Sequence, residues 1–139
     1  MIAVDTNALI YRVTEENPEL SAEMKKTVRQ AKQRFAECYG KHERMAIPMP
    51  ILTEFANYLR RKFSRQVANN TLDKLISDEN FKIIEAKEEY VLRASIMAEE
   101  LNADFTDSLI CTCLFANGIK KILTYDEDFR KFKEMEIIR

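Results

Sequence analysis

The chain has 139 residues, which is enough for a sizeable hydrophobic core, and we expect residues 1–139 to form a single domain. Hydrophobic residues make up 46% of the sequence and charged residues 32%, a balance typical of globular proteins and not of disordered chains. The formal net charge of -1 excludes a uniformly basic coat for nucleic acid but leaves room for a local basic patch.

The N-terminus and the cysteine content restrict the location and the chemistry that we expect. No signal-like stretch begins the chain and no apolar run approaches the ~20 residues of a membrane span, so we expect a cytoplasmic protein with no membrane partner. The three cysteines are an odd number, which argues against a disulfide scaffold. The single histidine, His42, lies in a polar stretch and is expected to be a solvated loop residue. A zinc site or a nucleophile activated by histidine is therefore disfavoured.

Segments typical of strands and of helices alternate along the chain. Short apolar runs predict strands at 1–5, 44–48, 81–84, 121–124 and 136–138. Apolar residues at helical spacing predict helices at 7–13, 19–39, 50–60, 65–77, 87–102, 106–117 and 127–132. Strands joined through helices need crossover connections. The predicted fold is therefore α/β, a three-layer α/β/α sandwich with a mainly parallel central sheet.

The two helices before the fourth strand carry further local signals. The first should turn an apolar stripe toward the core, formed by Val91, Ala94, Ala98 and Leu101. At the start of the second, Thr106 is the expected N-cap, and Phe105 and Ile110 are expected to form a hydrophobic staple. Gly118 should supply the left-handed residue that ends this helix.

Four acidic residues fall where the carboxyl ends of the parallel strands should meet. Asp5 ends the first strand, and Asp126 comes two residues after the strand that ends near Thr124. Asp107 lies in the first turn of the helix that leads into that strand, and Glu54 lies one turn into the helix after the second strand. Since sites in open parallel sheets gather beyond the carboxyl ends of the strands, the four acids can converge on one spot.

Each acid also has an ordinary explanation when it is taken alone. An acidic residue at such positions can cap a helix, favour the helix dipole, occupy a turn or lie on a solvated face. A cluster is harder to explain in this way, since two like charges ~4 Å apart cost roughly 4 kcal/mol at an effective dielectric of ~20. Such a cluster needs a cation or shared protons, and ligands that are all oxygen favour Mg²⁺ or Mn²⁺, which support phosphodiester hydrolysis. Asp104 and Asp128 are rival acids nearby, expected to be solvated or capping residues.

The motifs that contain these acids resemble those of the PIN-domain ribonucleases, and the resemblance covers nearly the whole chain. The matching stretches are "VDTNALI" at the start, "LTEF" around Glu54, "FTDSLICTCL" around Asp107 and "ILTYDEDF" around Asp126. They supply, in order, a strand that ends in Asp and Thr, a helical acid, a D-x-L-I helix start and a T-x-D-x-x-F motif. The small size of the chain is similar to that of VapC-type toxins of toxin–antitoxin pairs.

This resemblance implies an activity, partners and a role for each matched residue. It implies an endoribonuclease that depends on Mg²⁺ or Mn²⁺, a homodimer, and an antitoxin protein as a second partner. The catalytic metal ligands implied by it are Asp5, Glu54, Asp107 and Asp126. Three polar residues are expected to hold these acids in place by hydrogen bonds, namely Thr6, Asn7 and Thr124.

The substrate contacts and two other functions stay open at this point. Candidate contacts to RNA phosphates are Arg60, Arg61, Lys62 and Arg65, which equally suit a solvated helix end favoured by the dipole. One alternative function is a PIN-fold module that binds RNA or a protein without cutting, and another is a phosphatase-like enzyme on a similar sheet. A kinase or a dehydrogenase is disfavoured because neither GxxxxGK[ST] nor GxGxxG occurs.

Overall fold

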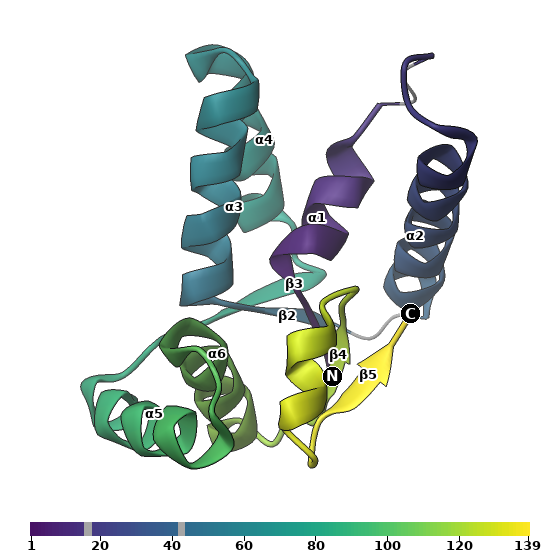
Figure 1. Cartoon of the computed structure of the whole chain (residues 1–139). Coiled ribbons are helices and arrows are strands. Elements are labelled where there is room, and N and C mark those ends of the chain that lie inside the picture. The colour runs from purple at the N-terminus through teal and green to yellow at the C-terminus, as the bar shows by residue number, and fades with distance from the viewer. Residues whose placement is uncertain (16–17, 42–43) are drawn as a thin grey trace.

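A five-stranded sheet runs through the middle of the molecule (Figure 1). The computed structural model describes residues 1–15, 18–41 and 44–139, so the expectation for His42 lies outside the described residues. The strands are β1 (Ile2–Val4), β2 (Met45–Pro48), β3 (Phe81–Ile84), β4 (Lys121–Leu123) and β5 (Glu136–Ile138). Their order is β3-β2-β1-β4-β5, and each neighbouring pair is parallel. The predicted α/β fold is confirmed, and the sheet that was expected to be mainly parallel is parallel throughout.

Helices cover both faces of this sheet and complete the three layers. One layer, above the strands in Figure 1, consists of α1 (Thr6–Val13), α2 (Ala22–Gly40), α3 (Met49–Lys62) and α4 (Arg65–Ser77). The other layer, below the strands, consists of α5 (Glu88–Leu101) and α6 (Phe105–Ala116). A short 3₁₀-helix, η1 (Glu127–Lys131), stands between β4 and β5. None of the described helices is long and apolar enough to cross a membrane.

The order in which the strands are added creates a switch point in the sheet. β1, β2 and β3 lie side by side in chain order, and the chain then crosses back through α5 and α6 to place β4 on the other side of β1. Since crossovers between parallel strands are right-handed, this change of direction moves the helices to the opposite face. The carboxyl ends of β1 and β4 thus stand side by side at the place where open α/β sheets bind ligands.

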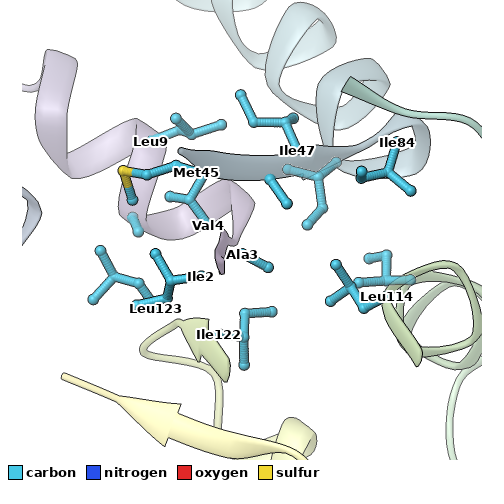
Figure 2. Packing of buried hydrophobic residues seen from close by; sticks show 14 of the residues in the cluster. Ile2, Ala3, Val4, Leu9, Met45, Ile47, Ile84, Leu114, Ile122 and Leu123 are labelled. Carbon is cyan, nitrogen blue, oxygen red and sulfur yellow. The ribbon is translucent and has the colours of Figure 1, made fainter. Parts of the chain in front are cut away.

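The strands are short and apolar because both of their faces are covered. The three residues of β1, namely Ile2, Ala3 and Val4, are all buried. Figure 2 shows them packed among side chains from the neighbouring strands and from α1 and α6. Burial of a large apolar side chain stabilises the fold by roughly 1.5–3 kcal/mol. The strand ends that lead to the switch point are therefore held by the core itself.

The first turn of α6 differs from the prediction. The helix begins at Phe105 with Asp104 as its N-cap residue, so Thr106 lies inside the helix and its prediction as the N-cap is wrong. Phe105 is 45% exposed whereas Ile110 is buried, so the predicted staple between them is also wrong. A staple needs its first residue before the N-cap, and Phe105 stands after it. Gly118, with φ of 70°, follows this helix as predicted.

The inward stripe of α5 is shifted from the predicted one. Val91 is 46% exposed and Leu101 is 37% exposed, so two of the four residues expected inside are wrong. Tyr90 and Ala94 are buried, and Met97 is partly buried against the core. These three residues also follow helical spacing, and their stripe includes the aromatic side chain, which has the most apolar area to bury. The face of α5 that packs on α6 is set by this larger side chain.

Candidate metal centre

Asp5 stands where β1 passes into α1. It is the N-cap residue of α1 by position, with φ of -86° and ψ of 164°, but its side chain makes no capping hydrogen bond to the helix. The carboxylate accepts a hydrogen bond from the hydroxyl of Thr124 instead, and the distance from Oγ1 to Oδ2 is 2.7 Å. The pairing of Val4 with Leu123 brings these two residues together, since each follows its strand directly. Asp5 is thus an acid buried at the switch point, only 5% exposed.

The same Thr124 hydroxyl also fixes the loop that carries Asp126. It accepts a hydrogen bond from the backbone N–H of Asp126, at 3.0 Å between nitrogen and oxygen. The side chain of Asp126 in turn accepts a bond of 2.9 Å from the backbone N–H of Asp128 and caps η1. Asp126 is therefore a capping residue, as its sequence position alone suggests, and the bond to Thr124 holds it beside Asp5.

Glu54 reaches the same region from the helical layer. It is exposed on α3, and its Oε2 accepts a hydrogen bond of 2.6 Å from the hydroxyl of Thr6. Asn7, which was expected to hold an acid, makes a different contact: its Oδ1 accepts a bond of 3.2 Å from the backbone N–H of Tyr125. Thr6 and Thr124 therefore contact acids directly, whereas Asn7 ties α1 to the loop after β4.

Asp107, half-buried in the first turn of α6, completes the set of four predicted acids. All four lie around one open pocket with a volume of about 580 Å³. The other residues that line it are Thr6, Asn7, Ile10, Asp104, Phe105 and Thr106. The structure thus gathers acids from four separate segments of the chain at the switch point.

The two rival acids named from the sequence lie near this pocket, and both are exposed, as expected of solvated residues. Asp104 has the N-cap position of α6 but makes no side-chain capping bond, and it lines the pocket. Carboxylate oxygens of Asp104, Asp107 and Asp128 all lie within 4.8 Å of one another. A signal was available in the sequence, because Asp104 stands three residues before Asp107 and such pairs share one face of a helical turn.

The electrostatics of the pocket reflect this crowding of carboxylates. Burial raises the pKa of Asp5 to about 6, against the lowering effect of the hydrogen bond from Thr124, and the charges of Glu54 and Asp126 raise it further. Partial burial also raises the pKa of Asp107 to about 6, with the charges of Asp126 and Asp5 as the next causes. Two carboxyl groups with raised pKa values in one pocket are typical of a functional site.

The donor set of the pocket limits what it can bind. Among the residues described, the side chains that line it include neither a cysteine nor a histidine, and its acids and hydroxyl groups offer oxygen atoms. Hard cations such as Mg²⁺ and Mn²⁺ prefer such ligands, and a bound cation would relieve the repulsion that raises the two pKa values. The residues present therefore fit a divalent cation.

The predicted basic cluster, formed by Arg60, Arg61, Lys62 and Arg65, lies outside this pocket. All four side chains are exposed, at the end of α3 and the start of α4. Arg61 comes seven residues after Glu54, which places it on the same side of α3 and about 10 Å further along the helix. The cluster therefore stands two helical turns from the acidic pocket.

Three solved structures have a similar fold. VapBC2 from Rickettsia felis, bound to a DNA fragment from their promoter, has a TM-score of 0.71 and 17% identity, covering 99% of this chain and 98% of that chain. VapC20 from Mycobacterium tuberculosis, a sarcin–ricin loop cleaving toxin, has a TM-score of 0.71 and 16% identity, with 94% and 93% covered. A toxin–antitoxin complex from Klebsiella pneumoniae has a TM-score of 0.70 and 18% identity, with 100% and 97% covered.

The family assignment comes from the sequence itself. None of the curated proteins compared with this chain matches it. The family model described as PIN domain matches residues 2–135, a range that contains β1 to β4 and every acid around the pocket. With the fold and the acidic pocket in the arrangement just described, the chain belongs to the PIN domain family.

Proposed function

We propose that this chain is a metal-dependent endoribonuclease that hydrolyses RNA phosphodiester bonds, acting as one domain. The observation that carries the proposal is the pocket at the switch point, where Asp5 and Asp107 both have a pKa raised to about 6 among further acids. Carboxylates crowded in this way destabilise the fold unless a cation binds them.

The ligands we assign to the divalent ion are Asp5, Glu54, Asp107 and Asp126. When bound, such an ion polarises the phosphate, lowers the pKa of a water molecule and orients its attack. Thr124 positions two of the ligands at once, because its hydroxyl donates to Asp5 and accepts from the backbone of Asp126. Below pH 6 protons compete with the ion for Asp5 and Asp107, so the site is ready to bind it above that pH.

A role as a toxin is the second part of the proposal. The similar structures include VapBC2 and a toxin–antitoxin complex, and VapC20 is called a sarcin–ricin loop cleaving toxin. By analogy we propose a homodimer, an antitoxin protein as partner, and RNA as substrate. Co-expression with the product of a small neighbouring reading frame, followed by purification of a stable complex, tests the antitoxin. Free chain alone after co-expression would contradict this part.

Two other functions predict different results with the same protein. A non-catalytic PIN-fold module would bind RNA in the presence of Mn²⁺ without shortening it, and a phosphatase-like enzyme would cleave a small phosphomonoester but leave RNA intact. The acids favour the nuclease over the binding module, because a chain that no longer cuts has no need to keep charges that repel one another.

Substitution of two ligands tests the nuclease directly. We expect Asp5→Asn and Asp107→Asn each to abolish Mn²⁺-dependent cleavage of total RNA, because each loses a charge that would bind the cation. Cleavage is followed on denaturing gels, with EDTA as the condition in which the wild-type chain should also be inactive.

The matched control is Asp73→Asn, which makes the same change at an exposed acid of α4 that does not line the pocket. It should cleave RNA as the wild-type chain does. Circular dichroism spectra of all three variants should match that of the wild type. Undiminished cleavage by Asp5→Asn and Asp107→Asn would show that the nuclease proposal is wrong.

A further inference from the structure

Phe105 is an aromatic side chain without an assigned role in the acidic pocket. It is the first residue of α6, it is 45% exposed, and it lines the pocket next to Asp104. The predicted staple would have explained it, but this staple does not form, since Ile110 is buried in the core whereas Phe105 is exposed. A large apolar ring placed among carboxylates does not help to bind a cation, so its position needs another explanation.

The pocket is larger than a cation requires. An octahedral ion surrounded by six waters fills about 180 Å³, because each water takes roughly 30 Å³. The pocket measures about 580 Å³, and its apolar lining residues are Phe105 and Ile10. These two side chains give the mostly polar pocket an apolar part, and its volume leaves room for a planar group attached to a phosphate.

We propose that Phe105 is a stacking platform for an unpaired base of the RNA, next to the phosphate that is cut. This inference rests on the proposed nuclease function and deepens it, because it names a residue of the pocket that positions the substrate. Aromatic side chains bind unstacked bases through their π-faces, and the interaction tolerates any base. A base within a duplex has both faces covered by its neighbours and is unavailable to Phe105.

RNA explains this residue better than a protein partner does. Phe105 lies in the wall of the same pocket as the four proposed ligands, so a phosphate held by the cation brings its own nucleotides to the ring. The acids around the ring repel an acidic peptide and bind RNA only through the cation. Phe105 therefore acts as a positioning residue for substrate that is already at the metal.

The absence of tryptophan from the sequence allows a direct test of stacking. In Phe105→Trp the new indole is the only one in the chain, and stacking on a base quenches its fluorescence. The probe is a six-nucleotide oligoadenylate, with Ca²⁺ replacing Mn²⁺ to avoid cleavage, and the comparison is an abasic ribose-phosphate chain of equal length. The matched control is Leu92→Trp, at a residue of α5 that is 70% exposed and does not line the pocket.

We expect oligoadenylate to quench Phe105→Trp, the abasic chain to leave it bright, and neither to change Leu92→Trp. Equal quenching by the abasic chain, or none by oligoadenylate, would overturn the stacking role. If the wild-type chain cuts no RNA but Phe105→Trp is quenched as expected, the nuclease proposal is wrong and the stacking role stands. The failure of one proposal can therefore be distinguished from the failure of the other.

Cleavage kinetics provide the second measurement. Phe105→Ala should raise KM for single-stranded RNA by about 5- to 150-fold, the range for alanine replacement of a stacking residue, with little change in kcat. Phe105→Tyr should restore KM, and Leu92→Ala should leave it unchanged. An unchanged KM in Phe105→Ala would overturn the proposal.

Discussion

Two threonine hydroxyls each donate a hydrogen bond to an acid of the pocket, one at the end of the sheet and the other at its helical rim. The Thr124–Asp5 bond measures 2.7 Å and the Thr6–Glu54 bond 2.6 Å, so the two pairs have nearly the same geometry. Their surroundings differ, because Asp5 and Thr124 are buried whereas Glu54 is exposed. The same type of hydrogen bond should therefore contribute differently to stability in the two regions.

The difference follows from how water competes with each pair. A buried acid has lost its hydration, so its charge destabilises the fold and its hydrogen bonds are costly to break. An exposed acid keeps its water and adjusts freely to whatever binds it. We therefore expect the side chain of Asp5 to be held rigidly and to destabilise the fold when it is charged. We expect the side chain of Glu54 to move freely and to cost the fold little.

The largest expected effect is on stability, and it separates Asp5 from Glu54. In the absence of metal at pH 7, Asp5→Asn should stabilise the chain by up to about 3 kcal/mol, because the pKa of Asp5 is raised from 3.8 to about 6. Glu54→Gln should change little, as expected for an exposed acid. Urea unfolding curves in EDTA measure both.

The pH dependence of the wild-type chain gives the control. An acid whose pKa is raised in the fold stabilises it fully below the unfolded value of 3.8, and this contribution is lost as pH rises through about 6. The advantage of Asp5→Asn should therefore disappear at pH 4 and return by pH 7. Addition of Mn²⁺ should stabilise the wild type more than the variant. An Asp5→Asn chain that is less stable than wild type at pH 7 would contradict the claim that the charge of Asp5 destabilises the fold.

The next effect compares the two threonines themselves. Thr124→Val keeps the shape of the side chain but removes the donor to Asp5 and the acceptor for Asp126, so metal affinity should fall about 10- to 100-fold. Thr6→Val removes only an exposed bond to Glu54 and should have a smaller effect. Titration with Mn²⁺ measures both, and Thr124→Ser should restore affinity. Equal losses in the two valine variants would show that burial does not distinguish the pairs.

The smallest effect concerns how far along α3 the contacts with RNA extend from Glu54. If Arg61 contacts one RNA phosphate, Arg61→Ala should reduce the slope of log affinity against log salt by about 0.7. The matched control is Arg93→Ala, an exposed arginine of α5 outside the pocket, which should leave the slope unchanged. Identical slopes for both variants and the wild type would exclude Arg61 as a phosphate contact.

The fold is predictable from this sequence because a doubly covered parallel sheet needs continuous apolar runs. All five strands therefore appear in the sequence within a residue of their observed bounds. Helix starts were harder to predict because they depend on a single residue. Before α6, Asp104 and Thr106 are both good N-caps, and the backbone began the helix at the earlier one.

The site is predictable in its outline and not in its contacts. The order of the strands brings Asp5 and Asp126 together, and the motifs identify them without any knowledge of distance. The contact of Asn7 with Tyr125 was missed because the partner of a side chain in the first turn of a helix depends on the loop that packs against it. The exposure of Phe105 was missed because an aromatic residue near a helix start is compatible both with a hydrophobic staple and with the wall of a pocket.

The hydrogen bond between Thr124 and Asp5 joins residues 119 positions apart in the chain. It requires β4 to be docked beside β1, although β2, β3 and six helices separate these two strands along the chain. Contacts of such long range form late, because the loop that they close must first lose its entropy. Until β4 has docked, Asp5 lacks its hydrogen-bond donor and Asp126 is not held beside it. The acidic pocket is therefore complete only after the crossover through α5 and α6 has placed β4 beside β1.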